Sequence, residues 1–498
     1  MFFSIHANSK GGVYMAKRKD FHPVLVPALD ALIGDPGLIT PTKDGKLKAN
    51  DLYIPAQYID RIHEFRDEDE QSSRGEAATT LLGSFSHILE AIHYNDSDDA
   101  FTCANGMRIH FMPDDKLKLI STNGRRSGST THALATARLA QENYGKDDVA
   151  ILTGDDYMTS KALMSDIDVA HINPDIYTGR RKLVLPEKYY DEWFTNRHLS
   201  NESFAEAFPD EKPLLVNEFV EFEVDTSLAF TYGYSAGNIT QLIGRFEYDS
   251  CRGEAELRRL HYVEDLPRYI QPRSAGQAML AEVLMAPADE IPIVICPAVF
   301  GTGKTYMTTS TGLSMVADKK PKYDRIFVVP RDAELGKEIG FLPGNEREKT
   351  IAKAMPIVDN VRAFVKNKGD HKKGNAEMTA DDISKRVEFL IQQYFEFTSI
   401  INMGGRSLSD CWIIYDEAQD MERFQINQLM KRIGDGSKMI ITGDPNQVFN
   451  KHMSYYSNGL MYAATKMAGS RYAAVVSMFE DEITRSEAAR EIARLLDH

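Results

Sequence analysis

The stretch "AVFGTGKT", which ends at Thr305, has the residue types and spacing of a loop that binds the phosphates of a nucleotide. In such a loop, backbone N–H groups surround the phosphates, a lysine neutralises their charge, and the hydroxyl after the lysine binds Mg²⁺. Here Lys304 and Thr305 supply those side chains, while Gly301, Thr302 and Gly303 supply the backbone. The stretch therefore predicts a nucleotide site.

One position departs from the pattern G-x-x-x-x-G-K-[ST], because Ala298 stands where glycine is usual. Ala298 lies at the entrance of the loop, where a methyl group fits if the backbone φ is negative. Glycine matters most at Gly301 and Gly303, where the backbone must approach the anion or take a positive φ. A strand candidate, residues 291–296, precedes the loop and a helix candidate, residues 305–317, follows it. We therefore expect the loop to bind a nucleotide despite the substitution.

A second set of polar residues follows two other apolar segments. Asp416 and Glu417 come directly after "CWIIY", and Gln447 follows "KMIITG" within "ITGDPNQ". A phosphate loop needs an acid that holds Mg²⁺ through water and a group that orients or deprotonates the attacking water. We assign these roles to Asp416 and Glu417, and we expect the amide of Gln447 to sense the γ-phosphate.

The elements that must position these residues alternate between strand and helix from residue 263 onward. This alternation predicts an α/β domain, residues 263–498, in which a parallel sheet is flanked by helices. Short β-branched runs suit strands that are buried on both faces. The strand candidates are residues 291–296, 325–330, 411–416, 438–443 and 473–479, and the helix candidates include residues 305–317, 424–433 and 487–496.

The chain before residue 263 divides into two further parts. Residues 1–172 are mixed α/β, with a helix candidate at 131–145 and a strand at 149–156 that ends in carboxylates. Residues 173–262 are richer in alternating β patterns and are expected to form a β-rich connector. We expect residues 1–14 to be a tail without structure.

Composition limits the classes of function. The chain has 498 residues, 43% hydrophobic and 26% charged, which is typical of a soluble protein of two or three domains. A net charge of −15 excludes a generally basic surface that coats nucleic acid, so such a partner must be bound by a local patch or channel. The longest apolar stretch is too short to span a membrane, and no secretory signal is visible. The four cysteines are scattered without metal-site spacing, which favours a reducing cytoplasm.

Several motifs in order give the C-terminal part a resemblance to a known family. From about residue 270 the chain resembles the PhoH family of ATPases, which are related to helicases of superfamily one. The motifs that carry this resemblance are "PRSAGQ", "FGTGKT", "PRDAELGKEIGFLPG", "DEAQ", "MKRIGDGSKMIITGDPNQ" and "NGL".

The resemblance implies that the nucleotide is ATP, bound with Mg²⁺. It implies that Gln277, the last residue of "PRSAGQ", reads the adenine, and that Asp416 and Glu417 form the acidic pair of the site. Arg331 and Arg485 are candidates for a phosphate contact or for an arginine finger that crosses a subunit interface. It also implies a hexameric ring, whose channel needs only a few inward cations to bind single-stranded nucleic acid.

The N-terminal region, with the phrase "YTGRRKLVLP", resembles a PIN domain fused to PhoH. PIN nucleases gather three or four acids at strand ends to hold Mg²⁺ or Mn²⁺. The position of the first acid falls on Ala28, with Asp30 two residues later, and Asp60 stands where a glutamate is expected.

The remaining PIN positions are also only partly acidic. The third acid falls on Thr130 or Thr131, whereas Asp155 and Asp156 are kept. Two alternatives stay open: a degenerate PIN fold that binds or guides RNA, or a surviving nuclease with rearranged acids.

We therefore expect a Mg²⁺-dependent ATPase that couples hydrolysis to binding, translocation along or unwinding of RNA or another single-stranded nucleic acid. Two alternatives are an active ribonuclease with an accessory ATPase, and a ring-shaped ATP switch that controls a protein partner without moving along RNA.

Overall fold

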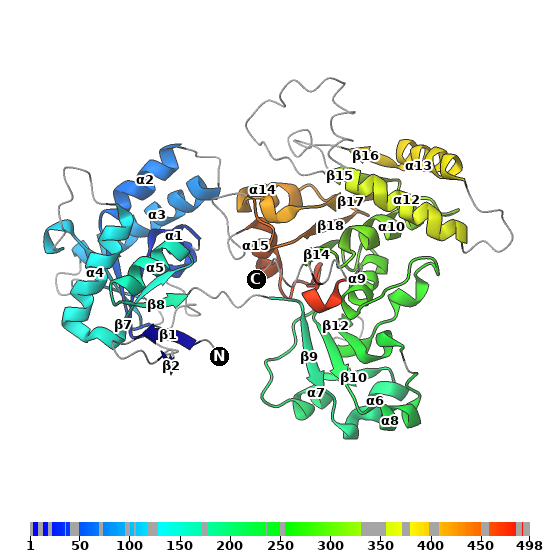
Figure 1. Cartoon of the computed structure of the whole chain (residues 1–498), viewed down its shortest axis with the longest axis horizontal. Helices are drawn as coiled ribbons and strands as arrows, with labels where there is room; N and C mark the ends of the chain where they lie inside the picture. The colour runs from blue at the N-terminus through cyan, green and yellow to red at the C-terminus, as the bar shows by residue number, and fades with distance from the viewer. Residues whose placement is uncertain are drawn as a thin grey trace. The chain divides into compact units, whose positions relative to one another are not determined.

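The computed structural model describes residues 3–7, 13–17, 22–34, 36–39, 49–68, 73–94, 100–103, 106–117, 128–171, 177–235, 237–249, 254–329, 355–370, 379–397, 408–449, 458–484 and 491. The chain folds into two compact units, residues 1–174 and 175–498 (Figure 1). The expected β-rich connector and the expected nucleotide-binding domain thus share one unit.

The first unit contains a six-stranded sheet in the order β5-β6-β4-β3-β7-β8. All neighbours pair in parallel except β5 and β6. Helix α4 (Ser129–Tyr144) and strand β7 confirm the helix and strand expected at 131–145 and 149–156. The other strands and larger helices are β3 (Val24–Pro27), β4 (Asp51–Pro55), β5 (Phe101–Thr102), β6 (Arg108–Met112), β7 (Val149–Thr153), β8 (Asp168–His171), α1 (Leu29–Gly34), α2 (Tyr58–Glu68), α3 (Ser73–Tyr94) and α5 (Asp156–Met164).

The expectation that residues 1–14 lack structure is wrong. Strand β1 (Phe3–Ala7) pairs antiparallel with β2 (Val13–Lys17). The sequence "FSIHA" alternates apolar and polar residues with the period of two that is typical of a strand.

The expected β-rich connector contains a five-stranded sheet in the order β10-β13-β12-β11-β9. Its neighbours pair antiparallel except β11 and β9, which are parallel. A core of aromatic and aliphatic side chains around Trp193 and Phe222 packs on this sheet. The strands are β9 (Arg180–Val184), β10 (His198–Ser200), β11 (Phe219–Glu223), β12 (Ile243–Asp249) and β13 (Glu254–Arg259), and the helices beside them are α6 (Tyr190–Thr195), α7 (Asn201–Ala207) and α8 (Thr226–Ala229).

The C-terminal sheet has the order β16-β15-β17-β18-β14-β19, and every pair in it is parallel, as expected. Five strands match the expected segments, and the three-residue β16 was not foreseen. The strands are β14 (Ile293–Pro297), β15 (Arg325–Val329), β16 (Phe395–Phe397), β17 (Cys411–Tyr415), β18 (Lys438–Gly443) and β19 (Ala473–Val475).

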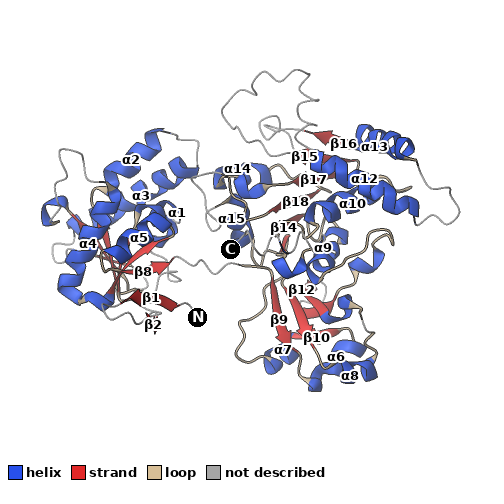
Figure 2. Cartoon of the chain, in the orientation of Figure 1, coloured by secondary structure: helices blue, strands red, loops and turns tan. Residues whose placement is uncertain are grey.

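Helices cover both faces of this sheet (Figure 2). Along β14, Val294 and Cys296 join one core cluster, while Ile293 and Ile295 join the other. This alternation follows from the period of two along a strand, so a strand covered on both faces must be apolar throughout. The helices are α9 (Ala275–Met285), α10 (Lys304–Val316), α12 (Met355–Asp370) and α13 (Ala380–Tyr394) on the first cluster, and α14 (Arg423–Met430) and α15 (Gly459–Lys466) on the second.

Two further points concern the helices of the chain. The helix expected at residues 487–496 lies almost entirely outside the described residues. Among the residues that are described, no helix is long and apolar enough to cross a membrane.

The connector and the C-terminal sheet are joined by buried polar contacts. Asn217 Nδ2 donates to the carbonyl oxygens of Ser470 and Ala473, at 3.2 and 3.1 Å. Arg245 Nη2 donates to Glu290 Oε1 at 2.8 Å, and the Arg245 side chain is 1% exposed. These contacts explain why the connector belongs to the same compact unit rather than forming a separate domain.

Candidate nucleotide-binding site

The loop between β14 and α10 has the backbone that a phosphate loop needs. Gly301 and Gly303 have φ values of 88° and 84°, as expected for both. At Gly303 an added Cβ would lie 2.7 Å from Gln277 Nε2, so contact as well as φ requires glycine. Ala298, in contrast, continues the strand, and its N–H donates to Gly443 O at 2.8 Å. The departure from the usual pattern therefore falls where a methyl group is accommodated.

The side chains at the start of α10 face the end of β17. Lys304, the first residue of α10, is buried, and Thr305 Oγ1 donates to Asp416 Oδ2 at 2.9 Å. Asp416 directly follows β17, and the carboxyl ends of parallel strands meet at one edge of a sheet. The structure thus brings together a hydroxyl and a carboxylate that are separated by 111 residues in the sequence.

Both oxygens of Asp416 have hydrogen-bond donors. Oδ1 accepts from Thr442 Oγ1 at 2.6 Å and from the Glu417 N–H at 3.1 Å. Thr442 is fully buried in β18, the neighbour of β17 in the sheet. These bonds fix the orientation of the carboxylate toward the loop. Sequence reasoning did not single out Thr442, because its role depends on which strands are neighbours.

Glu417 has a backbone conformation that is rare for this residue type. Its φ is 63° and its ψ is 38°, in the left-handed region, which costs about 1–3 kcal/mol for a residue other than glycine. Its carboxylate Oε2 accepts from Gln419 Nε2 at 2.6 Å. Strained backbone of this kind clusters at functional sites, and the role of Glu417 in orienting water stays a prediction.

Gln419 connects Glu417 to the loop after β18. Its Nε2 also donates to Gln447 O at 3.1 Å, and its Oε1 accepts from the Asp444 N–H at 3.0 Å. Gln419 is fully buried, and a Cβ at Gly443 would lie 2.3 Å from its Oε1. Gln419 is the last residue of the "DEAQ" motif, which marks it as a candidate, but the sequence alone does not indicate its role.

Asp444 ties the same loop to the phosphate loop. It is 2% exposed, and its Oδ2 accepts from the Phe300 N–H at 2.6 Å while its Oδ1 accepts from the Asn446 N–H at 3.0 Å. The N–H of Gln447 donates to Asp444 O at 3.0 Å, which places the expected sensor residue beside this connection.

Gln277 lies at the phosphate loop, and both ends of its amide are hydrogen-bonded to the protein. Its Oε1 accepts from the Arg273 N–H at 2.8 Å. Its Nε2 donates to Thr302 O at 2.7 Å and to Thr484 Oγ1 at 3.3 Å. The amide therefore holds the loop, and contact with adenine stays a prediction. The two arginine candidates, Arg331 and Arg485, lie outside the described residues.

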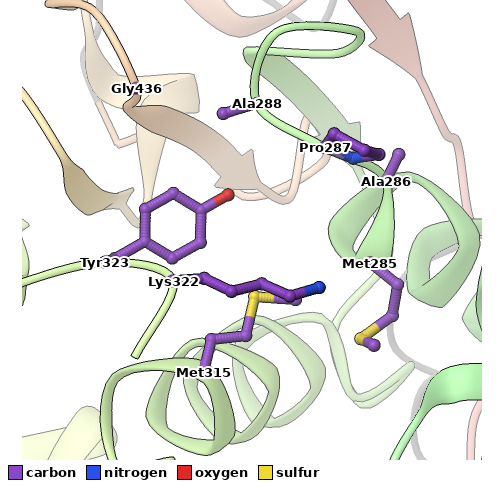
Figure 3. A pocket seen from close by; sticks show the side chains of 8 residues that line it. All are labelled: Met285, Ala286, Pro287, Ala288, Met315, Lys322, Tyr323 and Gly436. Carbon is purple, nitrogen blue, oxygen red and sulfur yellow. The ribbon is translucent and has the colours of Figure 1, made fainter. Parts of the chain in front are cut away.

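A pocket of about 230 Å³ lies in the same domain but away from the phosphate loop (Figure 3). Met285 and Met315, near the carboxyl ends of α9 and α10, face Lys322 and Tyr323, which precede β15. The pocket is thus at the amino ends of the strands, at the opposite edge of the sheet from Asp416. It is distinct from the candidate nucleotide site.

The acids of the N-terminal unit have hydrogen-bonding roles within the fold. Both carboxylate oxygens of Asp30 accept from Thr153 Oγ1, at 2.9 and 3.0 Å, and Oδ2 also accepts from the Gly154 N–H at 2.9 Å. Desolvation and the negative charge of Asp155 raise the pKa of Asp30, although the hydrogen bonds to its carboxylate act to lower it. The Asp155 carboxylate caps α5 by accepting from the N–H groups of residues 157 and 158.

The other PIN-like positions do not complete a metal site in the described residues. Asp60 is exposed on α2, and the side chain of Asp156 lies outside the described residues. Ala28 is buried, and both Thr130 and Thr131 lie in the first turn of α4.

Only one group of three metal-ligand side chains occurs among the residues that are described, and it is in the second unit. It consists of Glu247, His261 and Glu282, and Arg245 Nη2 lies 2.7 Å from Glu247 Oε1. The guanidinium already supplies a positive charge to this group.

Comparison with known proteins agrees with the geometry of the phosphate loop. Residues 269–497 match the family described as "PhoH-like protein". These residues form a PhoH-family domain. The chain is 26% identical to "Protein PhoH2" of Bacillus subtilis over 353 residues, which cover 70% of each chain.

Other relatives match this chain over a shorter length. "Protein PhoH2" of Thermobispora bispora is 29% identical over 227 residues, 46% of this chain and 47% of the relative. "PhoH-like protein" of Bacillus subtilis is 25% identical over 249 residues, 49% of this chain and 71% of the relative. The chain thus spans about half the length of some of the curated relatives that it matches.

Proposed function

We propose that the PhoH domain is a Mg²⁺-dependent ATPase. The observation that carries this proposal is the 2.9 Å contact between Thr305 Oγ1 and Asp416 Oδ2 beside a glycine-rich loop. Mg²⁺ prefers oxygen ligands and commonly binds through few protein groups, its own waters and the substrate phosphates. The hydroxyl and the carboxylate are ligands of this kind, and the ion would neutralise charge on the β- and γ-phosphates.

The remaining residues of the site act on the nucleotide and on water. The loop N–H groups and the Lys304 ammonium bind the phosphates. Glu417 orients the water whose oxygen attacks the γ-phosphorus; the bond to the β-γ bridging oxygen breaks, and the water proton passes to the Glu417 carboxylate. Gln447 senses the γ-phosphate with its amide.

Lys304→Ala tests this proposal. Because the ammonium is the cation that the loop supplies to the phosphates, the variant should lose Mg²⁺-dependent ATP hydrolysis while it keeps the fold. Lys466→Ala, at an exposed position on α15, is the matched control and should hydrolyse ATP like the wild type. Full turnover by the Lys304 variant would overturn the assignment.

We also propose that hydrolysis is coupled to binding, moving along or unwinding single-stranded RNA by a homohexameric ring in the cytoplasm. The resemblance to helicases of superfamily one supports this coupling, and a ring with a few inward cations accommodates a net charge of −15. Single-stranded RNA should stimulate the ATPase, and light scattering should give the mass of six chains. An ATPase that ignores RNA would favour a switch that controls a protein partner.

For the N-terminal unit we propose a PIN-like fold that guides RNA without cutting it. The parallel order β6-β4-β3-β7-β8 and the helices around it support the fold. The buried Ala28 and the use of Asp155 as a helix cap support the loss of cleavage. Asn caps a helix as well as Asp, so Asp155→Asn should keep the fold. Cleavage with Mg²⁺ or Mn²⁺ that disappears in this variant would favour a ribonuclease.

A further inference from the structure

An arginine of the connector sheet lies between two acids. Arg180, the first residue of β9, donates from Nη2 to Glu221 Oε2 at 2.6 Å and from Nη1 to Glu482 Oε2 at 2.8 Å. Its side chain is 10% exposed and that of Glu482 is 7% exposed. Glu221 belongs to the connector, whereas Glu482 belongs to the PhoH domain, so the guanidinium bridges the two.

Glu482 in turn holds the start of α9. Its Oε1 accepts from the Gly276 N–H at 2.5 Å, and its Oε2 accepts from the Phe479 N–H at 3.1 Å. A Cβ at Gly276 would lie 2.9 Å from both oxygens of Glu482, so the helix can approach the carboxylate only because residue 276 is glycine. A negative charge at a helix N-terminus is also favourable.

Two hydrogen bonds connect residues near Glu482 to the phosphate loop. Gln277, next to Gly276, donates to Thr302 O within the loop. Thr484, two residues after Glu482, donates its N–H to Gly301 O at 3.1 Å. These two of the hydrogen bonds that hold the loop from outside thus start next to Gly276, which Glu482 binds, and two residues after Glu482 itself.

We propose that the connector sheet positions the phosphate loop through the buried Arg180–Glu482 ion pair, which makes Arg180 a positioning residue for ATP binding. This inference rests on the proposed ATPase function. Removing the guanidinium leaves the Glu482 carboxylate buried and without its cation, and such a group must recruit water or move. Either change displaces Gly276 and Thr484, and the loop with them.

The next residue on the strand provides a matched control. Arg181 Nε donates to Glu218 Oε1 at 2.7 Å and its Nη1 donates to Glu211 Oε2 at 3.3 Å. Its side chain is 18% exposed, and both partners lie in the connector. Arg181 therefore has the same charge, strand and kind of partner, but its contacts with described residues all stay within the connector.

The experiment compares Arg180→Met with Arg181→Met in the full-length protein, with methionine chosen to keep the aliphatic stem. Arg180→Met should raise the KM for ATP about tenfold or more with a smaller change in kcat, because ångström-scale displacement of a binding group can cost up to about 10²-fold. Arg181→Met should stay within about twofold of the wild type. Equal KM values for the two variants would overturn the proposal.

A double-mutant cycle separates positioning from general loss of stability. In a Glu482→Gln background the effect of Arg180→Met on KM should largely disappear, because residue 482 then carries no buried charge that needs the guanidinium. An undiminished effect in that background would contradict the proposal. If Arg180→Met does not fold, Arg180→Lys keeps the charge but not the two-pronged geometry, and it should show the same rise in KM in weaker form.

A wild type that binds ATP without hydrolysing it would refute the ATPase proposal only. In that case the Kd of each variant for ATP would be measured by calorimetry, and it should change by the factors that are expected for KM. A wild type without affinity for ATP would overturn the positioning role as well.

Discussion

Replacing Gln419 with methionine should slow ATP hydrolysis while ATP binding stays nearly unchanged. Methionine keeps the length of the side chain but removes all three hydrogen bonds that the amide makes, to Glu417, Gln447 and Asp444. None of these groups belongs to the phosphate loop itself. The variant should therefore change how the Glu417 carboxylate, which we propose orients the attacking water, is held, rather than how the phosphates are bound.

The size of the effect follows from the 2.6 Å bond between Gln419 Nε2 and Glu417 Oε2. A hydrogen bond to a charged group is worth about 1.5–3 kcal/mol. If that energy holds Glu417 in its reactive orientation, its loss corresponds to a fall in kcat of about 10- to 150-fold. Loss of the hydrogen bond from the Asp444 N–H should also lower the free energy of unfolding by about 1–3 kcal/mol.

The assay is steady-state hydrolysis of Mg²⁺-ATP, from which kcat and KM are obtained separately, with urea unfolding in parallel. Gln425→Met is the control, since Gln425 Oε1 accepts from the Glu422 N–H in the capping box of α14, a contact that does not involve Glu417. The control should keep kcat. A Gln419 variant with normal kcat, or with raised KM and unchanged kcat, would refute the positioning of Glu417 by Gln419.

Three further outcomes are expected. Gly303→Ala should weaken ATP binding at least about tenfold in calorimetry, because its φ is 84° and its Cβ would overlap the Gln277 amide. The second unit, residues 175–498, should unfold in one cooperative thermal transition followed by circular dichroism, and a fragment of residues 263–498 should lack it, because the fragment lacks the connector's buried contacts. Burial acts to raise the pKa of Asp51, but hydrogen bonds, chiefly from Arg108, lower it below its usual value. The free energy of unfolding that Asp51 contributes is thus complete at pH values above the ordinary carboxyl pKa, and it is lost as the pH falls through the lower pKa of the folded state. In urea unfolding at a series of pH values, Asp51→Asn should therefore reduce the fall of the free energy of unfolding at acid pH. An unchanged pH dependence of the free energy of unfolding in the variant would contradict this.

The sequence was sufficient for features that depend on local spacing. Positive φ at Gly301 and Gly303 follows from the motif itself. The meeting of Thr305 and Asp416 follows because both residues come after strands of one parallel sheet. Alternating strand and helix patterns predict that sheet, although they do not give the order of its strands.

Features that depend on which elements are neighbours could not be predicted. Gln419 and Thr442 gain their roles because β17 lies beside β18, and periodicity does not show this pairing. The connector was recognised by its β pattern, but its union with the PhoH domain depends on contacts such as Arg180 with Glu482, which are 302 residues apart.

Isothermal titration calorimetry of ATP, with and without Mg²⁺, tests the central claim most directly. The claim is that Lys304, Thr305 and Asp416 bind the phosphates and the metal at one edge of the sheet. The wild type should bind one ATP per chain, more tightly with Mg²⁺. Asp416→Asn should abolish most of that Mg²⁺ dependence, since the carboxylate is the charged ligand. Absence of ATP binding by the wild type, or equal Mg²⁺ dependence in the variant, would contradict the account.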